Sequence, residues 1–117
     1  MTLGLNSALK TAVENDCAHR DIAFAQEAHV MLRPGDVLLA LSTSGNSRNC
    51  LMALRVARAR GAATAAMTGP GGGAMAAAAD VVVRAPGTCT KVIQEAHIAL
   101  WHAMCSLIEA HYFPAPR

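Results

Sequence analysis

The feature that most constrains this chain is a short polar loop, STSGNS at residues 42–47, set between two apolar segments of different periodicity. Before it stands a continuous apolar run over residues 37–41, which is typical of a strand covered on both faces. After it, apolar residues recur at helical spacing as far as Arg60, and Gly61 is placed to end the helix. A buried strand, a tight turn and a helix form a recurring unit of α/β proteins.

The composition of this loop favours an anionic ligand. The first N–H groups of the following helix have no partner within the helix, and they lie at the positive end of its dipole. Gly45 allows the backbone to approach a ligand closely. Four hydroxyl side chains add further donors: Ser42, Thr43, Ser44 and Ser47. A phosphate group is the expected ligand. The alternative is structural: Ser44 or Asn46 would simply cap the helix, because both residue types are favoured there.

Strands and helices alternate along the rest of the chain. The patterning predicts strands over residues 63–67 and 81–83, helices over 49–60 and 74–79, and a glycine-rich loop over 68–73. Toward the N-terminus it predicts the end of a strand over 1–6, a helix over 9–13 capped by Asn6 or Ser7, and a second helix over 19–32. This alternation favours right-handed βαβ units, so we expect an α/β fold with a parallel sheet in one domain.

A long final helix is predicted over residues 90–112, capped by Thr90 and followed by Pro114. Apolar or small residues occur on nearly every side of it, so most of its surface should be buried. In a chain of 117 residues such burial implies contact with another subunit. Three polar residues interrupt the helix: Gln94, His97 and His102.

The spacing of these polar residues limits how they can act together. Gln94 and His102 are eight positions apart, which places them about 80° apart around the axis and about 12 Å along it. Two long side chains could converge on one ligand or metal from that spacing. His97 lies about 140° round from His102, so the two histidines cannot easily share a metal. The alternative is that each polar group hydrogen-bonds across a subunit interface, which periodicity favours, above all for His97.

Composition argues against several classes of protein. A net charge of +2 without a basic cluster disfavours nucleic-acid binding. Residues 61–79 are uncharged and long enough to cross a bilayer, but glycines, Pro70 and two threonines divide them into a strand and a loop, so no membrane association is expected. The cysteines form no CxxC pair and no secretory leader precedes them, which predicts reduced thiols in a cytoplasmic protein: Cys17, Cys50, Cys89 and Cys105.

Several motifs occur in the order found in sugar isomerase (SIS) domains, and the chain resembles the phosphoheptose isomerases most closely. The motifs are LGLN at 3–6, Asn15-Asp16, RPGDVLLALSTSGNS at 33–47, TG at 68–69 with GGGAM at 71–75, and KVIQEAHIALWH at 91–102. The resemblance implies conversion of sedoheptulose 7-phosphate to D-glycero-D-manno-heptose 7-phosphate for lipopolysaccharide assembly. It also implies a three-layer αβα sandwich of flavodoxin-like topology around a parallel sheet, assembled as a homotetramer with active sites at subunit interfaces.

The resemblance further implies roles for individual residues. The loop residues Ser42, Thr43, Ser44 and Ser47 match the sugar-phosphate clamp of the family. Asp16 stands where the family has an acidic residue near the sugar. Gln94 and His102 match the glutamine and histidine that bind zinc in metal-containing members, with Gln94 also beside the substrate and His102 as the catalytic acid or base.

The sequence departs from the family pattern at two points. Before Met1 it lacks the family's first helix, first strand and GNGGSA-type loop, which supply a phosphate-binding serine, the general base and two metal ligands. We therefore expect an incomplete SIS domain over residues 1–117, with an unpaired strand edge and exposed apolar surface that favour an oligomer or aggregate. Lys91 also stands where some relatives have an acidic residue.

Two other functions stay open. One branch of the family binds the bacterial replication initiator, and the chain resembles it in the segments CSLIE at 105–109 and FP at 113–114. That branch has an asparagine where His102 stands, so the histidine favours the isomerase. The other possibility is a regulatory module that senses a sugar phosphate through the loop without catalysis.

Overall fold

Three parallel strands form the centre of the molecule, in the order β1–β2–β3. The computed structural model describes residues 1–114. Strand β1 spans Val37–Ser42, β2 spans Ala63–Thr68 and β3 spans Val81–Arg84. The register aligns Ser42 with Thr68 and Thr68 with Arg84, so the carboxyl ends of all three strands meet at one edge of the sheet. The predicted α/β fold with a parallel sheet is confirmed.

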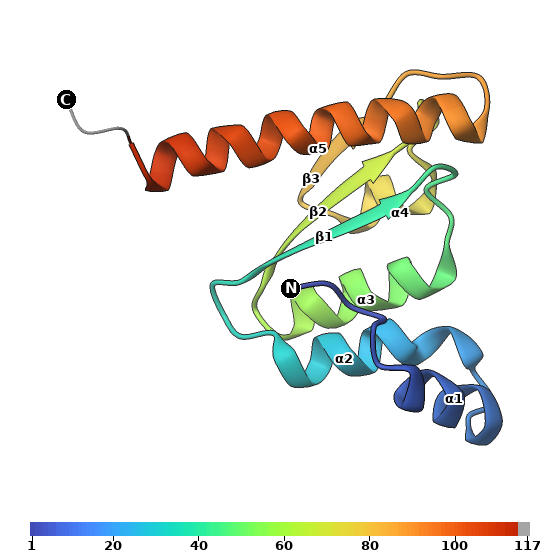
Figure 1. Ribbon diagram of the computed structural model, residues 1–117. Helices are drawn as coiled ribbons and strands as arrows, with labels where there is room; N and C mark the ends of the chain where they lie inside the picture. The colour runs from blue at the N-terminus through green and yellow to red at the C-terminus, as the bar shows by residue number, and fades with distance from the viewer. Residues whose placement is uncertain (115–117) are drawn as a thin grey trace.

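Helices cover the two faces of the sheet, which gives the three layers expected (Figure 1). Helix α5 (Thr90–Tyr112) runs along one face, while α2 (Ala23–Met31) and α3 (Arg48–Ala59) lie on the other. The remaining elements are α1 (Ser7–Asp16), which packs on α2, a 3₁₀ turn η1 (Arg20–Ile22), and α4 (Gly73–Ala78) between β2 and β3.

The core lies between the sheet and the helices on the α2–α3 side. Its members are mostly small or aliphatic: Ala28, Leu32, Leu38, Ala40, Ala53, Leu54, Ala57, Ala62, Ala66 and Met75. The alanines of α2 and α3 let these helices approach each other and the sheet closely, because they bring no bulk into the contact. Leu54 is fully buried at the centre of this layer, and burying a side chain of that size stabilises the fold by about 1.5–3 kcal/mol.

The connection from α4 into β3 is fixed by three reciprocal hydrogen bonds between Thr64 and Asp80. The backbone N–H and the hydroxyl of Thr64 donate to the Asp80 carboxylate at 2.8 and 2.7 Å, and the Asp80 N–H donates back to the Thr64 hydroxyl at 3.1 Å. The hydroxyl of Thr64 and then its backbone N–H lower the pKa of Asp80 below its usual 3.8. Desolvation opposes this shift, and the nearby Arg58 guanidinium adds to it. This junction sets where β3 begins.

The N-terminal arm differs from the sequence prediction. Residues 1–6 were expected to end a strand, but they form a turn, because in residues 1–114 they do not pair with the edge of β1. The Gly4 N–H donates to the Glu27 carboxylate instead, and the Asn6 side chain accepts a hydrogen bond from the Leu9 N–H at 3.1 Å. Asn6 is therefore the N-cap of α1, as predicted, and the helix extends beyond the expected residues 9–13 to Ser7–Asp16.

Two other predicted boundaries change for local reasons. The helix expected over 19–32 divides into η1 and α2, and the side chain at the N-cap of neither one makes a capping hydrogen bond. Thr90 does not cap α5: it is the first residue of the helix, and Cys89 occupies the N-cap position. The bounds of α5 agree with the prediction.

Within this chain most residues of α5 are exposed. Ile93 and His97 are its buried residues in the described part of the molecule, whereas Ile98 is 58% exposed and Leu107 is 72% exposed. The C-terminal half of the helix runs past the end of the three-stranded sheet, so the layer beneath it stops short (Figure 1). Burial of this apolar surface by another subunit stays a prediction.

The expected unpaired strand edge is present. Within residues 1–114, β1 pairs on one side alone, with β2. Exposed Val37 and Leu41 lie along it, and Trp101 of α5 lines the same groove, of about 630 Å³. In the same part of the chain, no helix combines the length and apolarity that crossing a bilayer requires.

Candidate functional site

Two loops at the carboxyl edge of the sheet pack closely against each other. The loop after β1 and the glycine-rich loop after β2 are joined by hydrogen bonds from the Gly69 N–H to the Thr43 carbonyl at 3.0 Å and from the Met75 N–H to the Gly45 carbonyl at 2.9 Å. Gly45 has φ +66°, and a β-carbon there would collide with the Gly72 carbonyl oxygen. The two loops thus form one unit whose closeness requires glycine.

The hydroxyl groups of the first loop form a cluster. The Ser42 Oγ lies 2.8 Å from the Ser47 Oγ and 3.4 Å from the Ser44 Oγ, and the Ser44 Oγ accepts a hydrogen bond from the Asn46 N–H at 3.1 Å. Ser42 is buried at the end of β1, which fixes one side of the cluster. Each hydroxyl can both donate and accept, so the cluster can turn its hydrogens toward an anion.

The capping alternative for Ser44 and Asn46 is wrong. The N-cap of α3 is Ser47, and its side chain makes no capping hydrogen bond. The Asn46 amide instead bridges the two loops: its oxygen accepts from the Ala74 N–H at 2.9 Å, and its nitrogen donates to the Ser44 carbonyl at 3.1 Å. Among the first N–H groups of α3, that of Cys50 donates to the Asn49 side-chain oxygen at 2.9 Å. Those of Arg48 and Asn49 have no partner in residues 1–114 and are left for water or a ligand.

A cleft of about 550 Å³ brings this loop together with α5. Its lining residues come from the end of β1, the loop and one turn of α5: Leu41, Ser42, Thr43, Ser44, Ser47, Gln94, His97 and Ile98. The structure therefore unites Gln94 with all four hydroxyl residues selected from the sequence. Asp16, at the end of α1, and His102, further along α5, are both exposed and do not line this cleft. Their functional roles stay predictions.

His97 is the cleft residue that the sequence reasoning assigned elsewhere. It is 5% exposed, and its Nε2 lies 3.1 Å from the Thr68 carbonyl oxygen of β2. The predicted hydrogen bond across a subunit interface is therefore wrong, since the partner lies in the same chain. The spacing Gln94–His97–Ile98 places three residues on one side of a helix, and that pattern could have indicated a shared surface.

The side chains that the structure describes do not form a complete zinc site. In the part of the chain that the structure describes, no group of three or more histidine, cysteine or acidic residues is placed to hold a metal ion. Protein zinc sites use three or four side-chain ligands. The pair Gln94 and His102 does not complete such a site.

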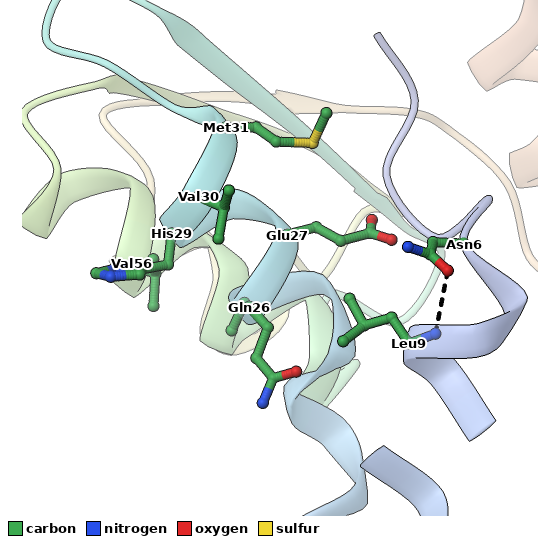
Figure 2. A pocket seen from close by; sticks show the side chains of 9 residues that line it. Asn6, Leu9, Gln26, Glu27, His29, Val30, Met31 and Val56 are labelled. Carbon is green, nitrogen blue, oxygen red and sulfur yellow. Dashed lines mark hydrogen bonds between the residues drawn. The ribbon is translucent and has the colours of Figure 1, made fainter. Parts of the chain in front are cut away.

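A second pocket, of about 650 Å³, lies between α1, α2 and α3 (Figure 2). Figure 2 shows Asn6 and Glu27 at one end and His29 with Val56 at the other. The polar groups at the first end already serve the fold, since Asn6 caps α1 and Glu27 accepts from the N-terminal arm. Its lining residues include no hydroxyl side chain, so the loop cleft is the better candidate for an anionic ligand.

Comparison with known proteins identifies the family of the chain. The family model described as SIS domain matches residues 17–112. The phosphoheptose isomerase of Rhodospirillum rubrum is 47% identical over 109 residues, which are 93% of this chain and 57% of that protein. The probable phosphoheptose isomerase of Thermoplasma volcanium is 39% identical over 112 residues, 96% of this chain and 57% of that protein.

Solved structures show the same relationship. The phosphoheptose isomerase GmhA of Neisseria gonorrhoeae superposes with a TM-score of 0.84 at 40% identity, covering 89% of this chain and 59% of that one. The phosphoheptose isomerase of Francisella tularensis gives a TM-score of 0.86 at 32% identity, with 92% and 58% covered. The chain thus spans somewhat under three fifths of the length of these relatives.

Proposed function

The chain belongs to the SIS domain family, and from that premise we propose that it binds a sugar phosphate at the 42–47 loop and serves the isomerisation of sedoheptulose 7-phosphate to D-glycero-D-manno-heptose 7-phosphate. The relatives named phosphoheptose isomerase support the reaction. The observation that carries the proposal is the cleft itself, which has a volume of about 550 Å³. The hydroxyl cluster at the start of α3 and Gln94 of α5 both line it. That volume lies in the range typical of small-molecule sites.

The phosphate is proposed to bind at the hydroxyl cluster. Ser44 and Ser47 offer donors there, and α3 adds the N–H groups of Arg48 and Asn49 and the positive end of its dipole. The sugar then extends toward α5, where the Gln94 amide can both donate and accept hydrogen bonds to hydroxyl groups. The glycine contact behind the loop keeps these donors in place before the ligand arrives, which lowers the entropic cost of binding.

Aldose–ketose isomerisation moves a proton between adjacent carbons, which needs a base at the carbon and an acid at the carbonyl oxygen. We assign His102 to one of these roles. In residues 1–114 neither His102 nor a carboxylate lines the cleft, so His102 and its partner in the proton transfer would both reach the sugar from outside these lining residues. Asp16 is assigned to sugar binding on the family pattern.

Three further assignments belong to the proposal. Gln94 and His102 would supply two ligands of a zinc ion, with the others from outside residues 1–114. The exposed apolar residues of α5 support a homo-oligomer, proposed as a tetramer. The four cysteines are free thiols, which supports a reducing compartment such as the cytoplasm.

Titration calorimetry with sedoheptulose 7-phosphate and with inorganic phosphate tests the binding site. Ser47→Ala should lower the affinity for both ligands about tenfold or more, because a hydrogen bond to a charged group is worth about 1.5–3 kcal/mol. Ser106→Ala removes an exposed hydroxyl of α5 that does not line the cleft and serves as the matched control. Equal affinities for Ser47→Ala and the unsubstituted chain would refute the site.

Turnover of the same sugar phosphate, with and without added zinc, tests the chemistry. His102→Ala should abolish isomerisation and leave inorganic phosphate binding unchanged, because the phosphate lies at the loop. Phosphate binding without turnover in the unsubstituted chain would instead favour the sensing function.

A further inference from the structure

The two ring nitrogens of His97 have different surroundings. Nε2 faces the Thr68 carbonyl oxygen at 3.1 Å. A carbonyl oxygen can only accept a hydrogen bond, so Nε2 must carry the hydrogen. In the neutral imidazole the other nitrogen, Nδ1, then holds an unshared electron pair and can only accept.

The Nδ1 atom of His97 is accessible to a ligand. In residues 1–114 it makes no hydrogen bond, and the same part of the chain has no buried side-chain nitrogen or oxygen left without a partner. Nδ1 must therefore be accessible, although the residue as a whole is 5% exposed. His97 lines the cleft together with Ser42, Ser47 and Gln94, so its accessible nitrogen is available to a ligand bound there.

The orientation of the ring is fixed by the sheet. The Thr68 carbonyl, at the end of β2, also accepts a hydrogen bond from the Ala85 N–H at 2.7 Å. Both of its lone pairs are thus in use, and one of them holds the imidazole. Thr68 itself is fully buried, so water does not compete for the hydrogen bond between its carbonyl and His97.

This arrangement places an acceptor beside a group of donors. The hydroxyl cluster and the helix N-terminus suit the ionised oxygens of a phosphate. An unshared pair on nitrogen repels such oxygens but accepts a hydrogen bond from a hydroxyl group. We propose that His97 contacts the substrate, its Nδ1 accepting a hydrogen bond from a hydroxyl of the sugar whose phosphate is held at the 42–47 loop. The inference rests on the proposed function, because it takes sugar-phosphate binding as given.

Two substitutions separate this contact from the structural role of His97. In His97→Gln the side-chain amide nitrogen takes the place of Nε2, so the hydrogen bond to Thr68 is kept and the acceptor at Nδ1 is lost. In His97→Asn the shorter amide takes the place of Nδ1, so an acceptor is kept and the anchor is lost. The pair exchanges one function for the other at a single position.

The readout is the ratio of two affinities, for sedoheptulose 7-phosphate and for inorganic phosphate, measured by calorimetry on the full chain. His97→Gln should bind the sugar phosphate about two- to tenfold more weakly, the value of one neutral hydrogen bond, and inorganic phosphate unchanged. His97→Asn should unfold at a lower temperature and keep the ratio of the unsubstituted chain.

Other outcomes separate the two proposals. If His97→Gln weakens both ligands equally, or neither, His97 is structural and the inference is wrong while the loop site stands. If the unsubstituted chain binds neither ligand, the proposed function and this inference both fail. If His97→Gln does not fold, a changed ratio in His97→Asn would by itself overturn the inference.

Discussion

The substitution Gly45→Ala tests whether the close contact between the two loops stabilises the fold. Gly45 has φ +66°, which an alanine adopts at about 1–2 kcal/mol. Its methyl group would also collide with the Gly72 carbonyl oxygen, so the two loops must separate. Separation removes the Met75 N–H to Gly45 carbonyl bond and the Ala74 N–H to Asn46 bond, each 2.9 Å long and each worth about 0.5–1.5 kcal/mol. The substitution should therefore lower the free energy of unfolding by about 2–5 kcal/mol.

Gly35→Ala provides the matched control. Gly35 also has a positive φ, +93°, but a β-carbon there would meet nothing within 4 Å. Gly35→Ala should lower the free energy of unfolding only by the cost of a positive φ for alanine, about 1–2 kcal/mol. Gly71→Ala, with open space and no positive φ, should change little. Urea unfolding at one fixed protein concentration gives all three values, and inorganic phosphate binding reports on the loop.

The difference between the Gly45 and Gly35 variants isolates the contact between the loops. We expect the free energy of unfolding of Gly45→Ala to be lower than that of Gly35→Ala by at least about 1 kcal/mol. Phosphate affinity should fall in Gly45→Ala alone. If both variants unfold at the same urea concentration, and both bind phosphate normally, the two loops are not held by this contact and the reasoning fails.

Three further predictions concern the rest of the chain. Leu54→Ala should lower the free energy of unfolding by about 2–5 kcal/mol in urea titrations, because Leu54 is fully buried; a loss under about 1 kcal/mol would mean that α3 packs loosely. Asp80 has a pKa below its usual 3.8 because Thr64 donates to its carboxylate, so it stabilises the folded state above that pH and ceases to do so as the pH falls through the lowered pKa. The advantage of the unsubstituted chain over Asp80→Asn in thermal unfolding should therefore shrink below about pH 4 and not change above it; a constant difference would contradict this. Burial raises the pKa of the Cys50 thiol, so iodoacetamide should label it more slowly than exposed Cys89, as mass spectrometry would show.

The elements that could be predicted from the sequence carry their own signals. The apolar run of β1 and the glycine after α3 each mark a boundary locally, and the helical periodicity of α5 gave its bounds. The strand expected over residues 1–6 failed because strand formation depends on a neighbour to pair with, and the local pattern contains no information about that neighbour. The partner that would bury α5 cannot be identified for a related reason: periodicity shows which sides are apolar and not what covers them.

The site was predictable to the same degree. The hydroxyl loop is a contiguous segment, so its residues could be selected together from the sequence. Gln94 was selected by resemblance, and the fold brought it to the loop. His97 was missed because its role depends on a carbonyl of β2, 29 positions away in the chain. Helical geometry gave the angle between His97 and its neighbours, but only the packing of α5 on the sheet shows which element that side of the helix meets.

The contact between the two glycine loops has a consequence for how such sequences diverge. A side chain at Gly45 meets backbone of the other loop, and a side chain at Gly73 meets the backbone of Gly45 in return. No change at one position can be compensated by a smaller residue at the other, because both already have the smallest. Among homologues that keep this contact, the two positions should be invariant and show no covariation. The contact between the two loops would then be invisible to methods that infer contacts from correlated substitutions.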